Sequence, residues 1–279
     1  MRVMITGAAG LLGAAIVGEL SSTAEVSAFD RSALDITDAG QVSATVAAVA
    51  PDVIVNCAAY NGVDAAEDDP PGALSVNTFG VLALARAAAA AGAIFVHYSS
   101  GFVFDGESDR PYVEEDTAAP KNVYGASKLL GDWFALDLPS AYVLRVEAVF
   151  GPSTRKRGSL VTIVSRIRAG EPVPVFVDRT VTPSYTADVA AATHALITRR
   201  PPFGLYHCVN AGAASWDELA KTAADMLGLP FRATPITLET ANLRARRPRW
   251  SALSPAKLAA VGIEMPTWRD ALARYLATV

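Results

Sequence analysis

A glycine-rich turn directly behind the first apolar run constrains the fold of this chain more than any other feature. The run Val3–Thr6 precedes the turn, and a helical pattern follows it as far as Leu20. Glycines at this spacing allow a tight turn, a close approach of the backbone to a pyrophosphate, and close packing of the helix on the strand. The N–H groups and the dipole of a helix N-terminus favour the same anion. The pattern therefore predicts a dinucleotide-binding turn whose cofactor contacts are Gly7, Gly10, Leu11, Leu12 and Gly13.

The alternation of strand and helix continues through the first half of the chain. Further apolar runs occur at 26–29, 53–55, 94–98 and 142–146. Hydrophobicity within the runs is continuous, which indicates a parallel sheet buried on both faces. Prolines become frequent after residue 150. We expect an α/β fold in which 1–150 form a doubly wound parallel-sheet domain and 151–279 mainly a smaller α/β substrate lobe, with 178–200 packing back on the first domain.

The composition of the 279 residues argues against several classes of partner. A net charge of −4 and a pI near 5.4 disfavour a nucleic acid polymer, which normally binds a basic domain or stripe. No feature argues for a membrane. Cys57 and Cys208 lie in apolar runs and are expected to be buried free thiols, and the N-terminus lacks the basic and apolar regions of a signal peptide. A cytoplasmic protein is therefore expected.

The second strand ends on two residues with opposing preferences for the cofactor. Asp30 suits the adenosine ribose hydroxyls of NADH, whereas Arg31 suits the 2′-phosphate of NADPH. NADH or NADPH is therefore expected, with a slight lean to NADH and with dual use left open. Further cofactor contacts are expected beside the adenine and after the third strand, at Asp35, Ile36, Ala58, Ala59 and Tyr60.

A tyrosine and a lysine four residues apart carry the most informative chemistry in the sequence. Tyr124 and Lys128 begin a predicted helix, and their spacing puts both side chains on one face. The lysine cation, together with the positive nicotinamide of an oxidised cofactor, lowers the pKa of the phenol toward a useful range. Ser100, with Ser99 as its neighbour, ends a predicted strand where a hydroxyl can bond a substrate carbonyl. Ser100, Tyr124 and Lys128 are the predicted catalytic residues, and no metal site is expected.

These motifs resemble the extended short-chain dehydrogenase/reductases, which have a Rossmann domain, and within them the dTDP-4-dehydrorhamnose reductase family. The resemblance covers nearly the whole chain. It implies reduction of the C4 ketone of a nucleotide-linked deoxyhexose by NADH or NADPH: Tyr124 would deliver a proton, Ser100 would polarise the carbonyl, and Lys128 would hold the nicotinamide ribose. Beyond the residues above, it rests on 51–60, 63–64, Glu67, 76–77, 97–100, 103–106, 120–129, Arg145, 204–207, 215–216 and 246–248.

Two departures from the family pattern concern the sugar. Where the family commonly has an aspartate and a tyrosine after the Ser-Thr pair, this chain has Gly101 and Phe102, and a tryptophan that covers the sugar is Ala148 here. Glu147 would either replace the lost carboxylate or form a structural ion pair. Arg247 would either clamp a diphosphate or belong to a salt-bridged loop. A different ketosugar is hypothesised, bound by Val63, Ser99, Ser100, Gly101, Phe102, Glu147, Ala148 and Arg247.

Two other functions remain open at this stage. One is a sugar-nucleotide epimerase or dehydratase of the same extended family, although the residues after Ser99 contain no acidic pair of the kind that dehydratases use. The other is a non-catalytic cofactor-binding regulatory subunit, as in the related subunit of methionine adenosyltransferase. The expected ligand is a nucleotide-diphosphate sugar. The sequence leaves open its identity, the product stereochemistry and the oligomeric state, a homodimer included.

Overall fold

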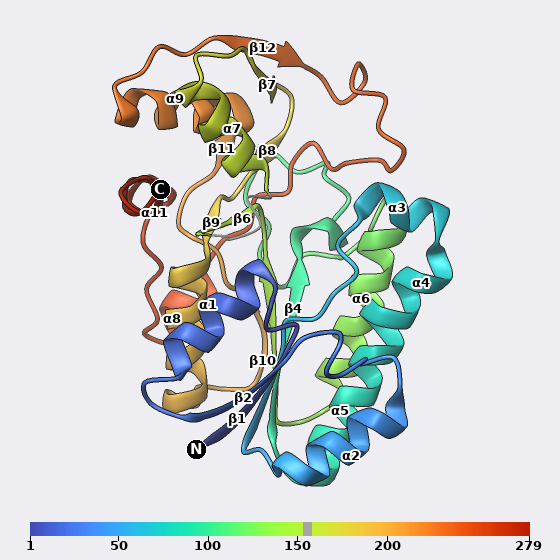
Figure 1. Cartoon of the computed structure of the whole chain (residues 1–279). Coiled ribbons are helices and arrows are strands. Elements are labelled where there is room, and N and C mark those ends of the chain that lie inside the picture. The colour runs from blue at the N-terminus through green and yellow to red at the C-terminus, as the bar shows by residue number, and fades with distance from the viewer. Residues whose placement is uncertain (153–157) are drawn as a thin grey trace.

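A six-stranded parallel sheet forms the centre of the molecule (Figure 1). The computed structural model describes residues 1–152 and 158–279. The strand order is β10-β5-β4-β3-β1-β2, so the chain reverses its direction of winding between β1 and β3. In such sheets ligands bind outside the carboxyl ends of the strands at this switch point. The strands of the sheet are β1 (Arg2–Thr6), β2 (Glu25–Phe29), β3 (Val53–Asn56), β4 (Ile94–Ser100), β5 (Ala141–Val146) and β10 (Gly204–His207).

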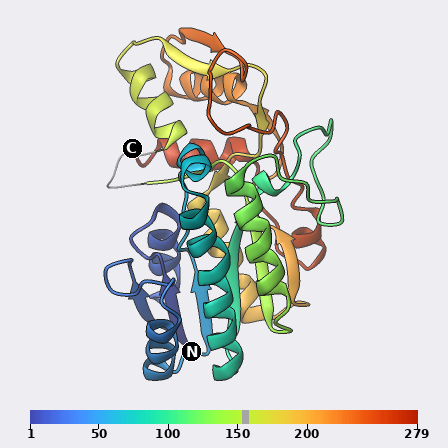
Figure 2. The same cartoon turned by 90° about the vertical axis from the view of Figure 1, so that its right-hand side faces the viewer.

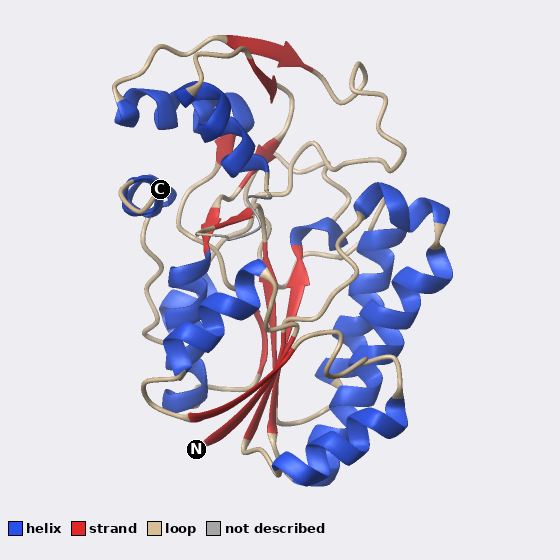
Figure 3. Ribbon diagram, viewed as in Figure 1, coloured by secondary structure: helices blue, strands red, loops and turns tan. Residues whose placement is uncertain are grey.

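Helices cover both faces of this sheet (Figures 1 and 3). Val3 and Ile5 pack with α1 and α8 on one face, while Met4 between them packs with α2 and α5 on the other. The continuous apolar runs follow from this double burial, and the predicted doubly wound fold is confirmed. The helical elements of this half are α1 (Leu11–Leu20), α2 (Ala39–Val49), α3 (Val63–Asp68), α4 (Pro70–Leu74), the π-helical η1 (Ser75–Phe79), α5 (Gly80–Ala91), the 3-10 turn η2 (Gly101–Val103), α6 (Val123–Leu136) and α8 (Thr186–Arg199).

A smaller lobe lies beyond the carboxyl ends of the strands, as Figures 1 and 2 both show. Its core packs α7, α9 and α11 together with short strand pairs, and Trp268 is among its most buried side chains. The segment 204–207 falls within the range predicted for this lobe but is instead the edge strand β10 of the main sheet. The remaining elements are β6 (Val149–Phe150), α7 (Ser159–Arg168), β7 (Val173–Phe176), β8 (Thr180–Val181), β9 (Ser184–Tyr185), β11 (Ala214–Ser215), α9 (Trp216–Leu227), β12 (Ala233–Ile236), α10 (Ala256–Ala260) and α11 (Trp268–Leu276).

One continuous helical stretch, Pro70–Ala91, is long and apolar enough to cross a membrane by length and composition alone. In the fold it packs against α2 and α6. Its apolar residues Val81, Leu84 and Ala88 are buried in the core on that face of the sheet. The apolar character of this stretch is thus accounted for by its place in the core.

Candidate active site

Two adjoining cavities open at the carboxyl ends of the central strands. The inter-lobe cavity, of about 460 Å³, is lined by both halves of the chain and contains Ser100, Tyr124, Lys128 and Glu147. The β2-side cavity, of about 380 Å³, lies beside the ends of β1 and β2 and contains Asp30 and the turn after β1. Both cavities are bordered by Gly10, Cys57, Ala58, Ala59 and Asn61, so they form one continuous site.

Two positions of the glycine-rich turn have room only for glycine. Gly7 has φ +66°, and a Cβ there would lie 2.5 Å from the Ala58 nitrogen at the end of β3. A Cβ on Gly13 would lie 2.2 Å from the Gly7 carbonyl oxygen. Helix α1 has Gly10 as its N-cap, with no side-chain cap and no acidic residue in its first turn. The first N–H groups of α1 thus meet no anionic side chain of their own turn, and this cradle fits the pyrophosphate of a dinucleotide.

The remaining predicted cofactor contacts lie around the β2-side cavity. Asp30, Arg31, Asp35, Ile36 and Tyr60 all border it. Oδ1 of Asp30 accepts hydrogen bonds from the Ser32 backbone N–H (2.9 Å) and the Ser32 hydroxyl (2.6 Å), which fix the carboxylate at the end of β2. Oδ1 of Asp35 accepts in the same way from Thr37, and these bonds lower the pKa of Asp35.

Tyr124 and Ser100 meet because α6 approaches the end of β4 very closely. A Cβ on Gly125 would lie 2.2 Å from the Phe102 carbonyl oxygen, so only glycine permits this contact. The Phe102 ring packs edge-on against Tyr124, with centroids 5.6 Å apart. Burial raises the pKa of Tyr124 to about 12, while a hydrogen bond with the Ser100 side chain opposes the rise. The expected lowering of this pKa by Lys128 is therefore not seen, and the phenol is protonated at neutral pH and able to donate.

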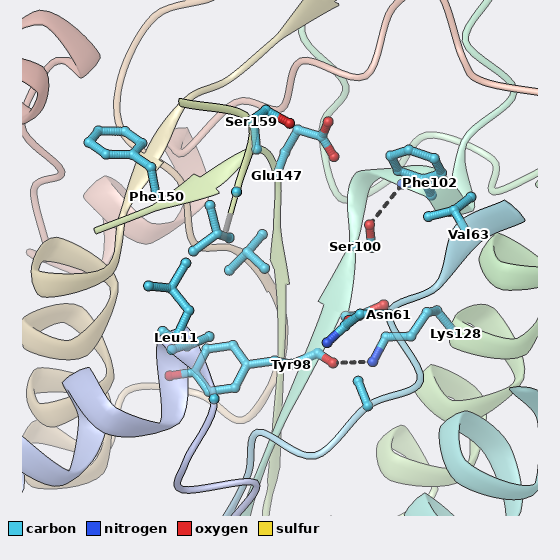
Figure 4. A pocket seen from close by; sticks show the side chains of 18 of the residues that line it. Leu11, Asn61, Val63, Tyr98, Ser100, Phe102, Lys128, Glu147, Phe150 and Ser159 are labelled. Atoms are coloured by element: carbon cyan, nitrogen blue, oxygen red, sulfur yellow. Dashed lines mark hydrogen bonds between the residues drawn. The ribbon is translucent and has the colours of Figure 1, made fainter. Parts of the chain in front are cut away.

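Lys128 lies one turn further along α6 and is almost fully buried, although it borders the inter-lobe cavity. Its ammonium donates a 2.5 Å hydrogen bond to the Tyr98 carbonyl (Figure 4). Burial lowers the pKa of Lys128 to about 8, and the nearby Asp132 carboxylate opposes this change. Asp132 is itself held by Arg145, with Nε 3.1 Å from Oδ2. The Asp132 carboxylate thus favours the charged form of Lys128, whose ammonium bonds the Tyr98 carbonyl.

Glu147 takes part in an ion pair and also borders the inter-lobe cavity. Its Oε1 accepts a hydrogen bond from the Ser251 hydroxyl (2.8 Å) and lies 3.5 Å from Nη2 of Arg179. Burial raises the pKa of Glu147, and the Arg179 cation opposes the rise. Ala148, next to it, has φ +43° and borders the same cavity.

Gly101 differs from the other predicted site residues in its location. It is buried behind the wall formed by Glu147 and Ser251 and does not border the inter-lobe cavity, because the Glu147 carboxylate and the Ser251 carbonyl fill the space in front of it. The expectation that residue 101 faces the sugar is therefore wrong for this chain. The other predicted substrate contacts, Val63, Ser99, Ser100, Phe102, Glu147, Ala148 and Arg247, all border the cavity.

Arg247 forms an ion pair within the protein and also borders the inter-lobe cavity, while its contact with a diphosphate stays a prediction. Its guanidinium makes a two-point ion pair with Asp64, at 3.1 and 2.7 Å, and so ties the loop to α3. It also lines the inter-lobe cavity beside the Phe102 ring. Arg246 and Arg249 line a different cavity.

Sequence reasoning missed several cavity residues, above all those supplied by the second lobe. Arg179 precedes β8 and stacks its guanidinium 5.1 Å from the Phe102 ring centroid. Trp216 begins α9, where the Ser215 side chain caps the helix. Trp216 belongs to the motif 215–216 that resembles the family, so the sequence offered a signal for it. No sequence signal indicated Arg179. The full set of missed residues in the inter-lobe cavity is Asn56, Cys57, Asn61, Tyr98, Val146, Val149, Phe150, Gly158, Ser159, Leu160, Arg179, Trp216 and Leu219.

Known proteins match this sequence over nearly its whole length. The family model described as the RmlD substrate binding domain matches residues 1–279. A dTDP-4-dehydrorhamnose reductase from Streptomyces griseus is 37% identical, covering 97% of this chain and 91% of the relative. A probable dTDP-4,6-dihydroxy-2-methyloxan-3-one 4-ketoreductase from Streptomyces antibioticus is 35% identical, covering 98% and 93%.

A solved structure gives the same result for the fold. The dTDP-4-dehydrorhamnose reductase of Bacillus anthracis, in complex with NADP, superposes with a TM-score of 0.95 at 32% identity, covering 100% of this chain and 99% of that one. The fold, the continuous cradle at the switch point and these matches lead to one conclusion. The chain belongs to the RmlD family, whose named relatives are dTDP-4-dehydrorhamnose reductases and a related 4-ketoreductase.

Proposed function

We propose that this protein uses NADH or NADPH to reduce the 4-keto group of a dTDP-linked deoxysugar. The observation that supports this most strongly is the meeting of Ser100, Tyr124 and Lys128 in a cavity that continues into the dinucleotide cradle. The named relatives act on dTDP-sugars, and the Bacillus anthracis structure contains NADP. Because the rhamnose-type relative and the other ketoreductase are nearly equally identical to this chain, identity alone does not choose the sugar.

Each catalytic side chain has a role that follows from its surroundings. When bound, the reduced nicotinamide supplies the hydride for the carbonyl carbon. The Ser100 hydroxyl hydrogen-bonds the carbonyl oxygen and orients it. Tyr124, which burial keeps protonated, donates its proton to that oxygen as negative charge develops. Lys128 holds the nicotinamide ribose and stabilises the phenolate that remains.

The nucleotide half of the substrate has a suitable place in the second lobe. A cavity of about 500 Å³ adjoins the inter-lobe cavity through Ser159, Arg179 and Trp216 and is also lined by Phe176 and Arg166. Aromatic rings suit a base, and the Arg166 guanidinium suits a diphosphate. The indole nitrogen of Trp216 is buried without a hydrogen-bond partner among the described residues, as expected for a donor that meets a ligand.

A spectrophotometric assay of the purified protein tests the proposed function. With freshly prepared dTDP-4-keto-6-deoxysugars, we expect stoichiometric oxidation of NADH or NADPH and a product that NMR identifies as the 4-hydroxy sugar. An epimerase or a dehydratase would convert sugar without consuming added cofactor. A regulatory subunit would bind cofactor without turnover, and either result would contradict the proposal.

Arg31 is expected to contribute more to kcat/KM for NADPH than to kcat/KM for NADH. Its side chain borders the β2-side cavity beside Asp30, where a ribose 2′-phosphate would lie. Removing one charge-assisted hydrogen bond costs about 1.5 kcal/mol, which is about tenfold in kcat/KM. We expect Arg31→Ala to lower kcat/KM for NADPH about tenfold and to change that for NADH less than twofold. The control is Arg86→Ala, an exposed arginine of α5 outside both cavities. An equal loss of kcat/KM for NADPH and NADH in Arg31→Ala would contradict a contact between Arg31 and the 2′-phosphate.

A further inference from the structure

The buried carboxylate of Glu147 belongs to the cavity wall, and the roles proposed for Ser100, Tyr124 and Lys128 give it no function. Glu147 lies in the turn between β5 and β6 and is only 3% exposed. The Ser251 hydroxyl and the Arg179 guanidinium both approach its Oε1. Arg179 and Ser251 are distant from Glu147 in the sequence, and together they hold the Oε1 side of its carboxylate. The carboxylate is therefore held in position before any ligand arrives.

The other carboxylate oxygen, Oε2, lies on the side of Gly101, the residue that follows Ser100. Oε2 lies 2.9 Å from the point that a Cβ on Gly101 would occupy, and Gly101 directly follows Ser100. Figure 4 shows the Glu147 side chain on the Phe102 side of the cavity, above Ser100. The carboxylate is also close enough to Tyr124 to raise the pKa of the phenol. Because Glu147 borders the same cavity as Ser100 and Tyr124, a sugar whose carbonyl meets those two residues would have an adjacent ring position within reach of Glu147.

The same part of the wall offers a hydrogen-bond donor. Arg179 borders the cavity next to Glu147, and its Nε–H is buried without a partner among the described residues. The Glu147 carboxylate can accept a hydrogen bond and the Arg179 Nε–H can donate one. This pair suits a ligand hydroxyl group, which donates one hydrogen bond and accepts others. An ammonium is a poorer match because Arg179 already neutralises the carboxylate.

Sugar chemistry then identifies the hydroxyl. The carbonyl at C4 of a 6-deoxyhexopyranose lies between C3 and C5, and C5 bears the ring oxygen and the methyl group. Only C3 can carry a hydroxyl next to the carbonyl. Building on the proposed function, we infer that Glu147 and Arg179 bind the C3 hydroxyl and make the enzyme selective for 4-ketosugars that retain it.

Two dTDP-4-keto-6-deoxysugars that differ only in the C3 hydroxyl provide the test. For the unmodified protein, we expect kcat/KM with NADPH to be about 100-fold lower for the 3-deoxy sugar, because buried polar groups would lose their partner. In Glu147→Ala the two sugars should differ less than fivefold, since the selecting group is gone. In Glu147→Gln, which keeps an acceptor oxygen, a difference of about tenfold should remain.

Ser251→Ala is the matched control. It removes a hydrogen bond to Glu147 from a buried position outside the cavity, so at least tenfold selectivity should remain. Thermal melting and cofactor titration of each variant report folding separately. Equal rates of the unmodified protein on both sugars, or equal losses on both sugars in Glu147→Ala, would overturn the inference and leave the proposed function intact. If neither sugar is reduced by either cofactor, the proposed function fails as well.

Discussion

Tyr124→Phe is expected to lower kcat for ketosugar reduction about 1,000-fold and to leave the dissociation constant of NADPH within about twofold. The substitution removes the hydroxyl that donates the proton but keeps the ring that packs edge-on against Phe102. General acid catalysis by a positioned side chain contributes roughly 10²–10⁴-fold, which sets the size of the loss. Single-turnover oxidation of bound NADPH and fluorescence titration of the cofactor measure the two quantities.

Tyr142→Phe is the matched control for the loss of a tyrosine hydroxyl. The Tyr142 hydroxyl donates a 2.6 Å hydrogen bond to the Pro201 carbonyl, outside both cavities. That variant should lose about 1 kcal/mol of unfolding free energy and keep its kcat. If Tyr124→Phe retained more than a tenth of the original kcat, another group would have to supply the proton and the catalytic assignment would be wrong.

Gly13→Ala is expected to raise the dissociation constant of NADPH at least 100-fold. The new Cβ would lie 2.2 Å from the Gly7 carbonyl oxygen and 2.9 Å from the Ala8 Cα, so the turn after β1 must move. A 100-fold change corresponds to about 2.7 kcal/mol of binding free energy. Overpacking of this kind also destabilises the fold by about 1–3 kcal/mol. Calorimetric titration with NADPH and thermal melting separate the two effects.

Gly18→Ala offers the same substitution on the same helix, at a position where the new Cβ meets nothing within 4 Å. Alanine is the better helix former, so this variant should gain about 0.5–1 kcal/mol of unfolding free energy and bind NADPH unchanged. If Gly13→Ala also bound NADPH normally, the turn would not approach the pyrophosphate as proposed.

Much of the fold was predictable because its signals are local. The turn at Gly7 and Gly13 follows its strand directly, and continuous apolar runs reveal a sheet buried on both faces. The pair Tyr124 and Lys128 was visible for the same reason, since four residues make one helical turn. The edge strand β10 was placed in the wrong lobe because four residues after a proline pair carry no sign of which sheet they join.

The amino-acid sequence by itself determined the glycine turn after β1, the helix that carries Tyr124 and Lys128, and membership of the RmlD family. The tertiary structure alone decided which side chains of the second lobe border the inter-lobe cavity. Arg179 and Ser251 meet Glu147 from segments 32 and 104 residues away, and Glu147 closes the space in front of Gly101. Contacts of this kind leave no periodic pattern in the sequence. They form only when the second lobe packs against the ends of the strands.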